Sequence, residues 1–218
     1  MKTEVKVLLG IGLITIVILI GAVFLLPKGS STLTGNTIQP EDEKLLVKND
    51  SNKTGAVSAS IKIVEFGDYQ CPACGAVHPT LKRLTIDYKD KIMFVFRNFP
   101  LPQHMNAKVA AEAAEAAGEQ NKYWEMHDML YENQDKWADS TKPLDIFSVY
   151  AKELDMNIEK FKKAVQGLKF DEKIQSDIND GNSLGVNSTP TIFINNTKYE
   201  GVPDYDSLKK IVDSLIKR

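Results

Sequence analysis

The first apolar run lies close to the N-terminus, where residues Val7 to Leu26 are uncharged and mostly apolar. At a rise of 1.5 Å per residue, a helix of about 20 residues spans roughly 30 Å, the thickness of a bilayer core. Lys2 and Lys6 precede the run, so the positive-inside rule places the N-terminus in the cytoplasm and the remainder of the chain outside. The pattern therefore predicts a cytoplasmic stub and transmembrane anchor over residues 1–27.

A cleaved signal peptide is the alternative interpretation of this segment. Its apolar core is expected to be about 7–15 residues long and to be followed by small residues in an A-x-A-like cleavage site. Here the run is longer, and Pro27 and Lys28 follow it without a clear site. We therefore favour an uncleaved anchor.

Residues 28–59 are rich in Ser, Thr, Asn, Gly and Lys. Such a composition buries little apolar surface, so we expect most of the segment to be a flexible linker. The apolar triplet Leu45-Leu46-Val47 is the exception, and it could add a short edge strand to the following domain.

The remaining residues, 60–218, begin with a strand, a helix and a second strand. Ile61 to Phe66 and Ile92 to Phe96 are short β-branched and apolar runs typical of buried strands. Between them, Pro72 to about Tyr88 reads as a helix with a proline at its first position, although Pro79 lies inside it and should kink it. A strand, a helix and a strand of these lengths form a βαβ unit, so the two strands should be parallel.

The C-terminal part reads as a hairpin followed by a helix. Thr191–Asn195 and Thr197–Glu200 are the two expected strands, and Asp204 to Lys217 is amphipathic at helical spacing.

The chain between the second and third strands shows apolar residues at helical spacing in five segments: 108–117, 123–132, 144–154, 158–165 and 170–183. The predicted fold is α/β, a βαβ…ββα core with a helical subdomain inserted at about 101–184.

The charge and length of the chain narrow the range of functions that it can have. About 160 residues are enough for one compact domain with a real core. The net charge is −2 and the charged residues are interspersed, so the sequence does not indicate a nucleic-acid surface.

The chain has only two cysteines, Cys71 and Cys74, and they directly follow the first predicted strand. The loop that they close is too short to constrain the unfolded chain much, so the pair suits a reversible dithiol/disulfide couple better than a structural staple. A strand followed by C-x-x-C at a helix start is the thioredoxin-like redox arrangement. We expect Cys71 to be the nucleophile, because the helix N-terminus favours its thiolate, and Cys74 to be the more buried resolving thiol.

A metal site is the alternative interpretation of the cysteines. Cys71, Cys74 and His78 fall at i, i+3 and i+7 of one helix, but a structural zinc site needs a fourth ligand. The other histidines, His104 and His127, lie in the predicted insertion. We expect no metal and no organic cofactor, because the cysteine pair is itself the redox group.

Three segments carry a resemblance to a known family. Residues 65–74 resemble the active-site segment of the DsbA family of thiol:disulfide oxidoreductases, in particular its membrane-anchored, BdbD-like branch. Residues 185–195 look like the family's cis-proline segment, and residues 113–120 followed by 123–127 resemble its inserted helical domain. The resemblance covers Ile61 to Arg218 and implies a thioredoxin fold with a helical insertion.

The resemblance also implies residue roles. Pro190 would be cis and packed beside the cysteines, whereas sequence statistics alone favour trans. Thr189 would pair with an extended substrate, and Pro72 and Ala73 complete the expected substrate-binding set.

Glu65 matches a family acid beneath the resolving cysteine. A carboxyl group there should have a raised pKa and could exchange a proton with Cys74, although a salt-bridged structural role is the alternative. Trp124 and His127 are expected to be core residues.

The expected function is the introduction of disulfides into reduced exported proteins by a membrane-anchored, extracytoplasmic and monomeric enzyme. A membrane thiol oxidase of the DsbB or VKOR type would reoxidise it. Strongly oxidising relatives often carry histidine where this chain has Ala73, which leaves the potential open. The alternatives are a reductase or isomerase on the same fold, or a non-enzymatic chaperone for exported proteins.

Overall fold

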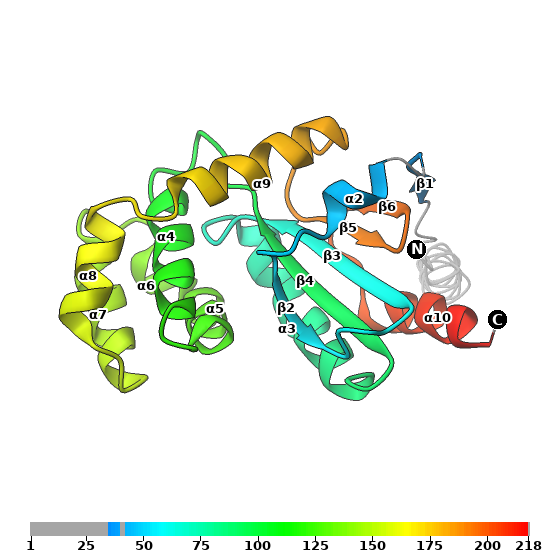
Figure 1. The fold of residues 1–218 in the computed structure, drawn as a ribbon, viewed down its shortest axis with the longest axis horizontal. Coiled ribbons are helices and arrows are strands. Elements are labelled where there is room, and N and C mark those ends of the chain that lie inside the picture. Colours follow the sequence, from blue (N-terminus) through cyan, green and yellow to red (C-terminus); the bar gives the residue numbers. More distant parts are fainter. Residues whose placement is uncertain (1–34, 40–41, 218) are drawn as a thin grey trace, which may run out of the picture. The chain divides into compact units, whose positions relative to one another are not determined.

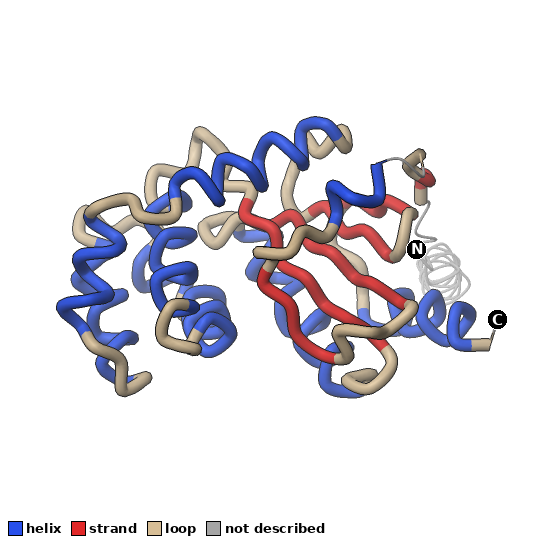
Figure 2. Tube along the Cα trace, in the orientation of Figure 1, coloured by secondary structure: helices blue, strands red, loops and turns tan. Residues whose placement is uncertain are grey.

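A mixed sheet forms the centre of the molecule (Figures 1 and 2). The computed structural model describes residues 35–39 and 42–217. Within them the sheet has six strands in the order β1-β6-β5-β3-β4-β2. The strands are β1 (Asn36–Thr37), β2 (Asn52–Gly55), β3 (Ile61–Gly67), β4 (Ile92–Asn98), β5 (Thr191–Ile194) and β6 (Thr197–Glu200). The pair β3–β4 is parallel and all the other pairs are antiparallel, which confirms the predicted βαβ unit and hairpin.

Helices cover both faces of this sheet. Those in the described residues are α2 (Glu43–Leu46), α3 (Pro72–Asp87), α4 (Ala107–Gly118), α5 (Tyr123–Glu132), α6 (Gln134–Trp137), α7 (Pro143–Glu153), α8 (Ile158–Gln166), α9 (Asp171–Ser183) and α10 (Tyr205–Ile216). Along β3, Ile61 and Ile63 belong to the core that includes α3 and α10, whereas Val64 and Phe66 belong to the core beneath α2 and α9. Since both faces are buried, the strand reads as an almost continuous apolar run.

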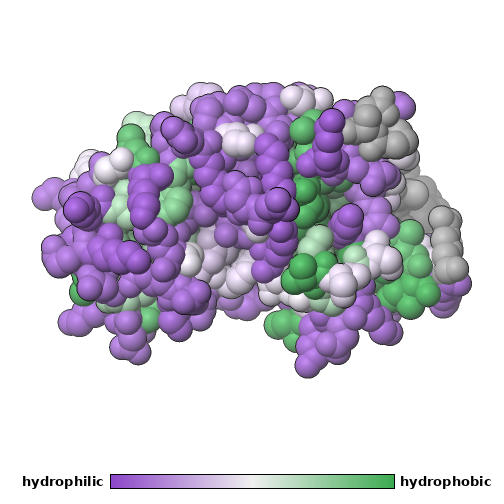
Figure 3. All heavy atoms as spheres, viewed as in Figure 1, coloured by the Kyte–Doolittle hydropathy of each residue, from purple (hydrophilic) through white to green (hydrophobic). Residues whose placement is uncertain are grey.

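Helices α4 to α8 form a subdomain beside the sheet (Figure 1). Its centre is the alanine-rich α4, where Ala110, Ala113, Ala114 and Ala117 are fully buried. Small side chains let neighbouring helices approach closely, so α4 contacts α5, α7 and α8 at once. The subdomain presents mostly hydrophilic side chains on the face seen in Figure 3. The five predicted helical segments are confirmed, and the short α6 is an additional one.

The predicted flexible linker, residues 28–59, is wrong over its second half. Leu45 and Leu46 lie in the short helix α2 and not in an edge strand, and Leu46 is buried against the sheet. The edge strand is instead β2, which pairs with β4, and the Trp124 indole donates a hydrogen bond to the Lys53 carbonyl. The backbone of a polar segment can complete a sheet edge without burying its side chains, so composition alone does not reveal such a strand.

The predicted anchor over residues 1–27 lies outside the described residues. Among residues 35–39 and 42–217, none of the helices has the length and apolar character needed to cross a membrane.

Candidate active site at the start of helix α3

Cys71 is the N-cap residue of α3, directly after the loop that leaves β3. Pro72 occupies the first turn, where its missing N–H costs nothing, and the Gly75 N–H donates to the Cys71 carbonyl at 3.1 Å. Cys71 is 6 % exposed, and its sulfur lies 3.4 Å from the Thr189 carbonyl oxygen, to which the protonated thiol donates a hydrogen bond. The helix start therefore holds the Cys71 sulfur just beneath the surface, against the loop before β5.

The Cys71 thiolate is strongly stabilised. A hydrogen bond from the Cys74 thiol, assisted by the Thr189 hydroxyl and by the backbone N–H groups of Cys74 and Ala73, lowers the pKa of Cys71 to about 5, although burial opposes the shift. The buried Thr189 hydroxyl makes no hydrogen bond to any of the described residues, so it is free to donate to the Cys71 thiolate. Cys71 is thus a thiolate at neutral pH even though the residue before Cys74 is Ala73 and not a histidine.

Cys74 has the opposite environment. It is fully buried, and burial raises its pKa well above the ordinary value, with a further contribution from its hydrogen bond to Cys71. Its sulfur accepts a hydrogen bond of 3.5 Å from the Asp68 N–H. One thiolate that keeps a small exposed surface, beside one fully buried and protonated thiol, is the asymmetry that the roles of nucleophile and resolving cysteine require.

The Thr189-Pro190 peptide bond is cis, as the family resemblance implied and sequence statistics did not. Both residues are buried in the loop before β5, and the Thr189 carbonyl faces the Cys71 thiol. The structure therefore brings the Thr189-Pro190 pair to the Cys71-Cys74 pair, although more than 100 residues separate the two pairs in the chain.

Glu65 lies in β3, three residues before the loop, and is 2 % exposed. Burial, followed by the negative charge of Cys71, raises the pKa of Glu65 to about 8. Its Oε1 has no hydrogen-bond partner, and its carboxyl group makes no ion pair with any described residue. The salt-bridged alternative does not fit this environment, whereas a neutral carboxyl group that exchanges a proton near Cys74 does.

The Asp68 side chain fixes the active-site loop through hydrogen bonds, a role that the sequence did not reveal. Its buried carboxylate accepts hydrogen bonds from the N–H groups of Gln70 and Leu101, and His104 Nδ1 lies 2.6 Å from it. In the sequence, Asp68 indicated only the end of a strand, because its partners Leu101 and His104 are over 30 residues away. Hydrogen bonds to Asp68 fix the geometry from which α3 starts.

Residues of the helical subdomain also form hydrogen bonds with this loop. Gln70 donates to the Ala138 carbonyl at 2.8 Å and accepts from the Asn106 N–H at 2.6 Å. Gln134, from α6, donates to the carbonyl oxygens of Tyr69 at 2.6 Å and Cys71 at 3.0 Å. The helix that the sequence analysis missed therefore positions the backbone of the nucleophile.

The zinc alternative for the cysteines is not supported. Among the described residues, His78 groups with His127 and Asp128, not with Cys71 and Cys74. His127 is buried, as predicted, and its ring contacts Tyr69 and Phe96 edge to face, whereas Trp124 is partly buried against the same core. Burial lowers the pKa of both His78 and His127, so both imidazoles are neutral at pH 7.

A thioredoxin family model matches residues 48–214 of the chain. Over 191 residues, the chain is 31% identical to the "Probable disulfide bond formation protein D" of Bacillus cereus, with 84% of this chain and 87% of that protein covered. It is also 35% identical over 161 residues to the "Na(+)/H(+) antiporter NhaA 1" of Salinispora arenicola, with 73% of this chain covered. The chain spans about a quarter of the length of that antiporter, 24%.

Solved structures show the same fold. BdbD from Bacillus subtilis is similar at a TM-score of 0.68 and 22% identity, with 86% of this chain and 100% of that chain covered. The thiol-disulfide exchange protein alpha-DsbA2 from Wolbachia pipientis is similar at a TM-score of 0.70 and 23% identity, with 80% and 92% covered.

A thioredoxin-type sheet, a C-x-x-C pair at a helix start and a proline loop against the first cysteine define the class of thiol:disulfide oxidoreductases. The chain belongs to the thioredoxin family, and over most of its length it is similar to a disulfide bond formation protein D.

Proposed function

We propose that this protein introduces disulfides into reduced exported proteins. The observation that carries the proposal is the contrast between the ionised Cys71 thiol and the buried, protonated Cys74 thiol. A thiolate that is stabilised in the reduced protein makes the disulfide easier to reduce, and hence a better oxidant. The name of the Bacillus cereus relative supports the same direction of the reaction.

The proposed exchange has two steps. A substrate thiolate attacks the Cys71 sulfur of the Cys71–Cys74 disulfide; the bond between the two cysteines breaks, and Cys74 leaves and takes up a proton, with Glu65 as the donor. A second substrate thiolate then attacks the substrate sulfur of the mixed disulfide, which forms the substrate's disulfide and releases Cys71 as a thiolate. The protein gains two electrons, and no organic cofactor takes part.

Substrate is proposed to lie along the loop at Thr189 and Pro190, next to Pro72 and Ala73 of the first turn of α3. Pro72 is exposed and Ala73 partly exposed, so both can contact a bound chain, whereas Cys74 stays out of its reach. An extended peptide there would bring its cysteine to Cys71 and to no other sulfur.

The ionisation of Cys71 tests the proposed direction. In the reduced protein, thiolate absorbance is expected to rise with a midpoint near pH 5. Relative to a thioredoxin-type couple, with a nucleophile pKa of about 7 and a potential of about −270 mV, this shift raises the potential at pH 7 by roughly 50 mV, to about −220 mV. Equilibration with glutathione buffers measures it.

A potential at or below about −270 mV would instead favour the reductase or isomerase alternative. A midpoint at or above about 8.5 would remove the proposed activation of Cys71 altogether. A chaperone would keep protecting unfolded exported chains after Cys71→Ser, whereas the proposed enzyme loses its activity.

We further propose that the domain works as a monomer outside the cytoplasm, held by a transmembrane anchor at residues 1–27, and that a membrane thiol oxidase of the DsbB or VKOR type reoxidises it. The apolar run and Lys2 and Lys6 support the topology. A reporter fused after Arg218 is expected to be active only outside the cytoplasm, and the protein to resist carbonate extraction. A soluble mature form that begins near Ser30 would show cleavage instead.

A further inference from the structure

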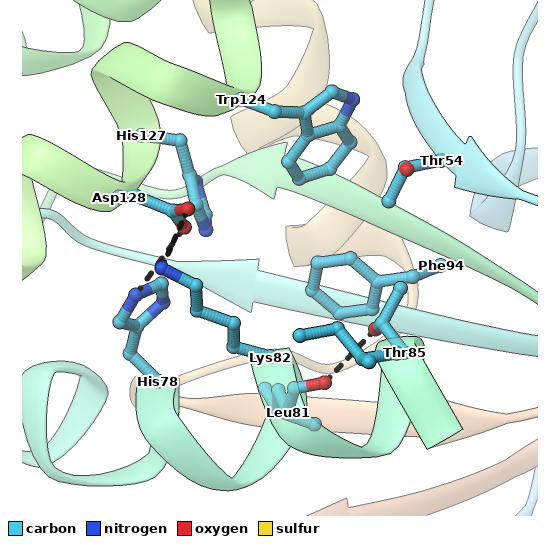
Figure 4. Close-up of a pocket in the computed structure, with 10 residues that line it drawn as sticks. Thr54, His78, Leu81, Lys82, Thr85, Phe94, Trp124, His127 and Asp128 are labelled. Carbon is cyan, nitrogen blue, oxygen red and sulfur yellow. Dashed lines mark hydrogen bonds and ion pairs between the residues drawn. The ribbon is translucent and has the colours of Figure 1, made fainter. Parts of the chain in front are cut away.

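A cavity of about 230 Å³ lies between α3 and α5, lined by residues that do not belong to the cysteine site. Figure 4 shows its two unlike ends. Leu81, Phe94 and Trp124 form an apolar wall, while His78, His127, Asp128 and Lys82 gather at the other end. The disulfide exchange uses none of these polar side chains.

Three of these groups offer ligand atoms that face one another. His78 Nε2 lies 3.4 Å from Asp128 Oδ1, and the ligand atoms of His78, His127 and Asp128 all lie within 4.8 Å of one another. Ligands at 2.0–2.1 Å from a tetrahedral metal are about 3.4 Å apart, so one pair already has this spacing. The Asp128 side chain is 30 % exposed and can rotate to shorten the remaining separation.

The hydrogen bonds of His127 leave its other ring nitrogen free. His127 Nδ1 lies 3.0 Å from the Tyr69 hydroxyl, which lies 3.1 Å from the Tyr123 hydroxyl. In the tautomer that carries its proton on Nδ1, His127 donates to the Tyr69 hydroxyl and Tyr69 donates to Tyr123, which leaves a lone pair on Nε2 of His127. An imidazole whose second nitrogen donates to a fixed acceptor is the usual arrangement of a metal-binding histidine.

His78 provides an independent indication. The residue is buried, and its Nε2 has no hydrogen-bond partner among the described residues. A buried polar atom without a partner is costly, and a ligand that fills the position removes the cost. The ring itself is held in place by stacking on Tyr131 at 5.0 Å between centroids.

Lys82 opposes a cation at this position. Its ammonium lies 2.8 Å from Asp128 Oδ2 and 2.7 Å from Glu132 Oε1. Because the Lys82 side chain is 39 % exposed, it can move away and keep only its contact with Glu132. Any metal must therefore compete with Lys82 for Asp128, which offers a direct test.

We propose that His78, His127 and Asp128 bind a divalent late first-row transition metal, with zinc as the type ion and water as the fourth ligand. Two imidazoles and one carboxylate are the donors that such ions accept. The bound ion would join α3, which begins at Cys71, to α5 of the helical subdomain.

Zinc titration of the Cys71→Ala/Cys74→Ala variant tests the proposal, since without thiols the ion cannot bind at the redox pair. We expect one saturable site by calorimetry. His78→Gln and Asp128→Asn should each weaken binding at least about tenfold, the lower end of what the loss of even an outer-shell partner costs. Asp90→Asn is the matched control, because it removes an exposed carboxylate that does not line the cavity.

Lys82→Met gives a second measurement that removes no ligand. Loss of the competing ammonium should tighten zinc binding, by about threefold or more, and increase the rise in melting temperature on adding zinc. The absence of saturable binding in the thiol-free protein overturns the proposal. So does binding that His78→Gln and Asp128→Asn leave unchanged, or binding that Lys82→Met weakens.

Discussion

Cys74→Ser is expected to turn the protein into a trap for its substrates. Cys71 keeps the hydrogen bonds from the backbone N–H groups of residues 73 and 74 that favour its thiolate, although the one from the Cys74 thiol is lost. The thiolate can attack a disulfide of a substrate protein, which breaks that disulfide, forms a mixed disulfide with Cys71 and releases one substrate thiolate. The buried thiol that resolves such a complex from within is gone, since Cys74 is the only other cysteine. Turnover should fall by roughly 10²-fold or more, and covalent complexes with exported proteins should accumulate.

Non-reducing gels with and without reductant measure this effect. The complexes should disappear on reduction, and the Cys71→Ser/Cys74→Ser double variant should form none. Glu112→Gln is a further control, since Glu112 is a buried acid in α4 without contact to either cysteine. If Cys74→Ser shows only monomer while substrate is present and Cys71 reacts with alkylating reagents, the thiol-exchange mechanism is wrong.

Glu65→Gln is expected to make the oxidised protein more stable in alkali and slower in exchange. In the reduced fold, burial and then the Cys71 charge raise the pKa of Glu65 from 4.5 to about 8. The oxidised protein lacks that charge but keeps the burial, which is the larger cause, so its folded state still holds the Glu65 proton more tightly than the unfolded state. The stabilising contribution of Glu65 is complete below pH 4.5 and is lost as the pH rises from there toward the raised pKa. Over this interval the wild type should lose about 1.4 kcal/mol per pH unit relative to glutamine, which does not titrate.

Denaturant unfolding of the oxidised proteins at pH 5 and pH 8.5 measures the difference, and the disulfide keeps both thiols from titrating. The two proteins should differ little at pH 5, and the variant should be clearly more stable at pH 8.5. Disulfide exchange of the variant should be slower, because the amide cannot deliver a proton to Cys74. Equal stability at both pH values would show that Glu65 is not a buried neutral acid. An unchanged exchange rate would remove Glu65 from the mechanism.

Local patterns in the sequence were sufficient for most elements. The five longer inserted helices follow from apolar residues at helical spacing, because one face of each helix is buried. Both parallel strands follow from short continuous apolar runs, because the sheet is buried on both faces. The C-x-x-C pair at a helix start also indicated the redox chemistry without any structure. The cis geometry at Pro190 came only from the family resemblance, since its cause is not local to Thr189 and Pro190.

The tertiary structure decided whatever depends on partners far away in the chain. Asn52–Gly55 became a strand because the edge of β4 offered its backbone groups a partner, which side-chain composition does not encode. Gln134 reaches the carbonyl of Cys71 across 63 residues, and His78 meets Asp128 across two helices. The sequence by itself determined most of the elements and the reacting cysteines, but not β2, α2 or α6. The fold alone determined the pKa values, since burial and hydrogen bonds arise only when distant segments pack together.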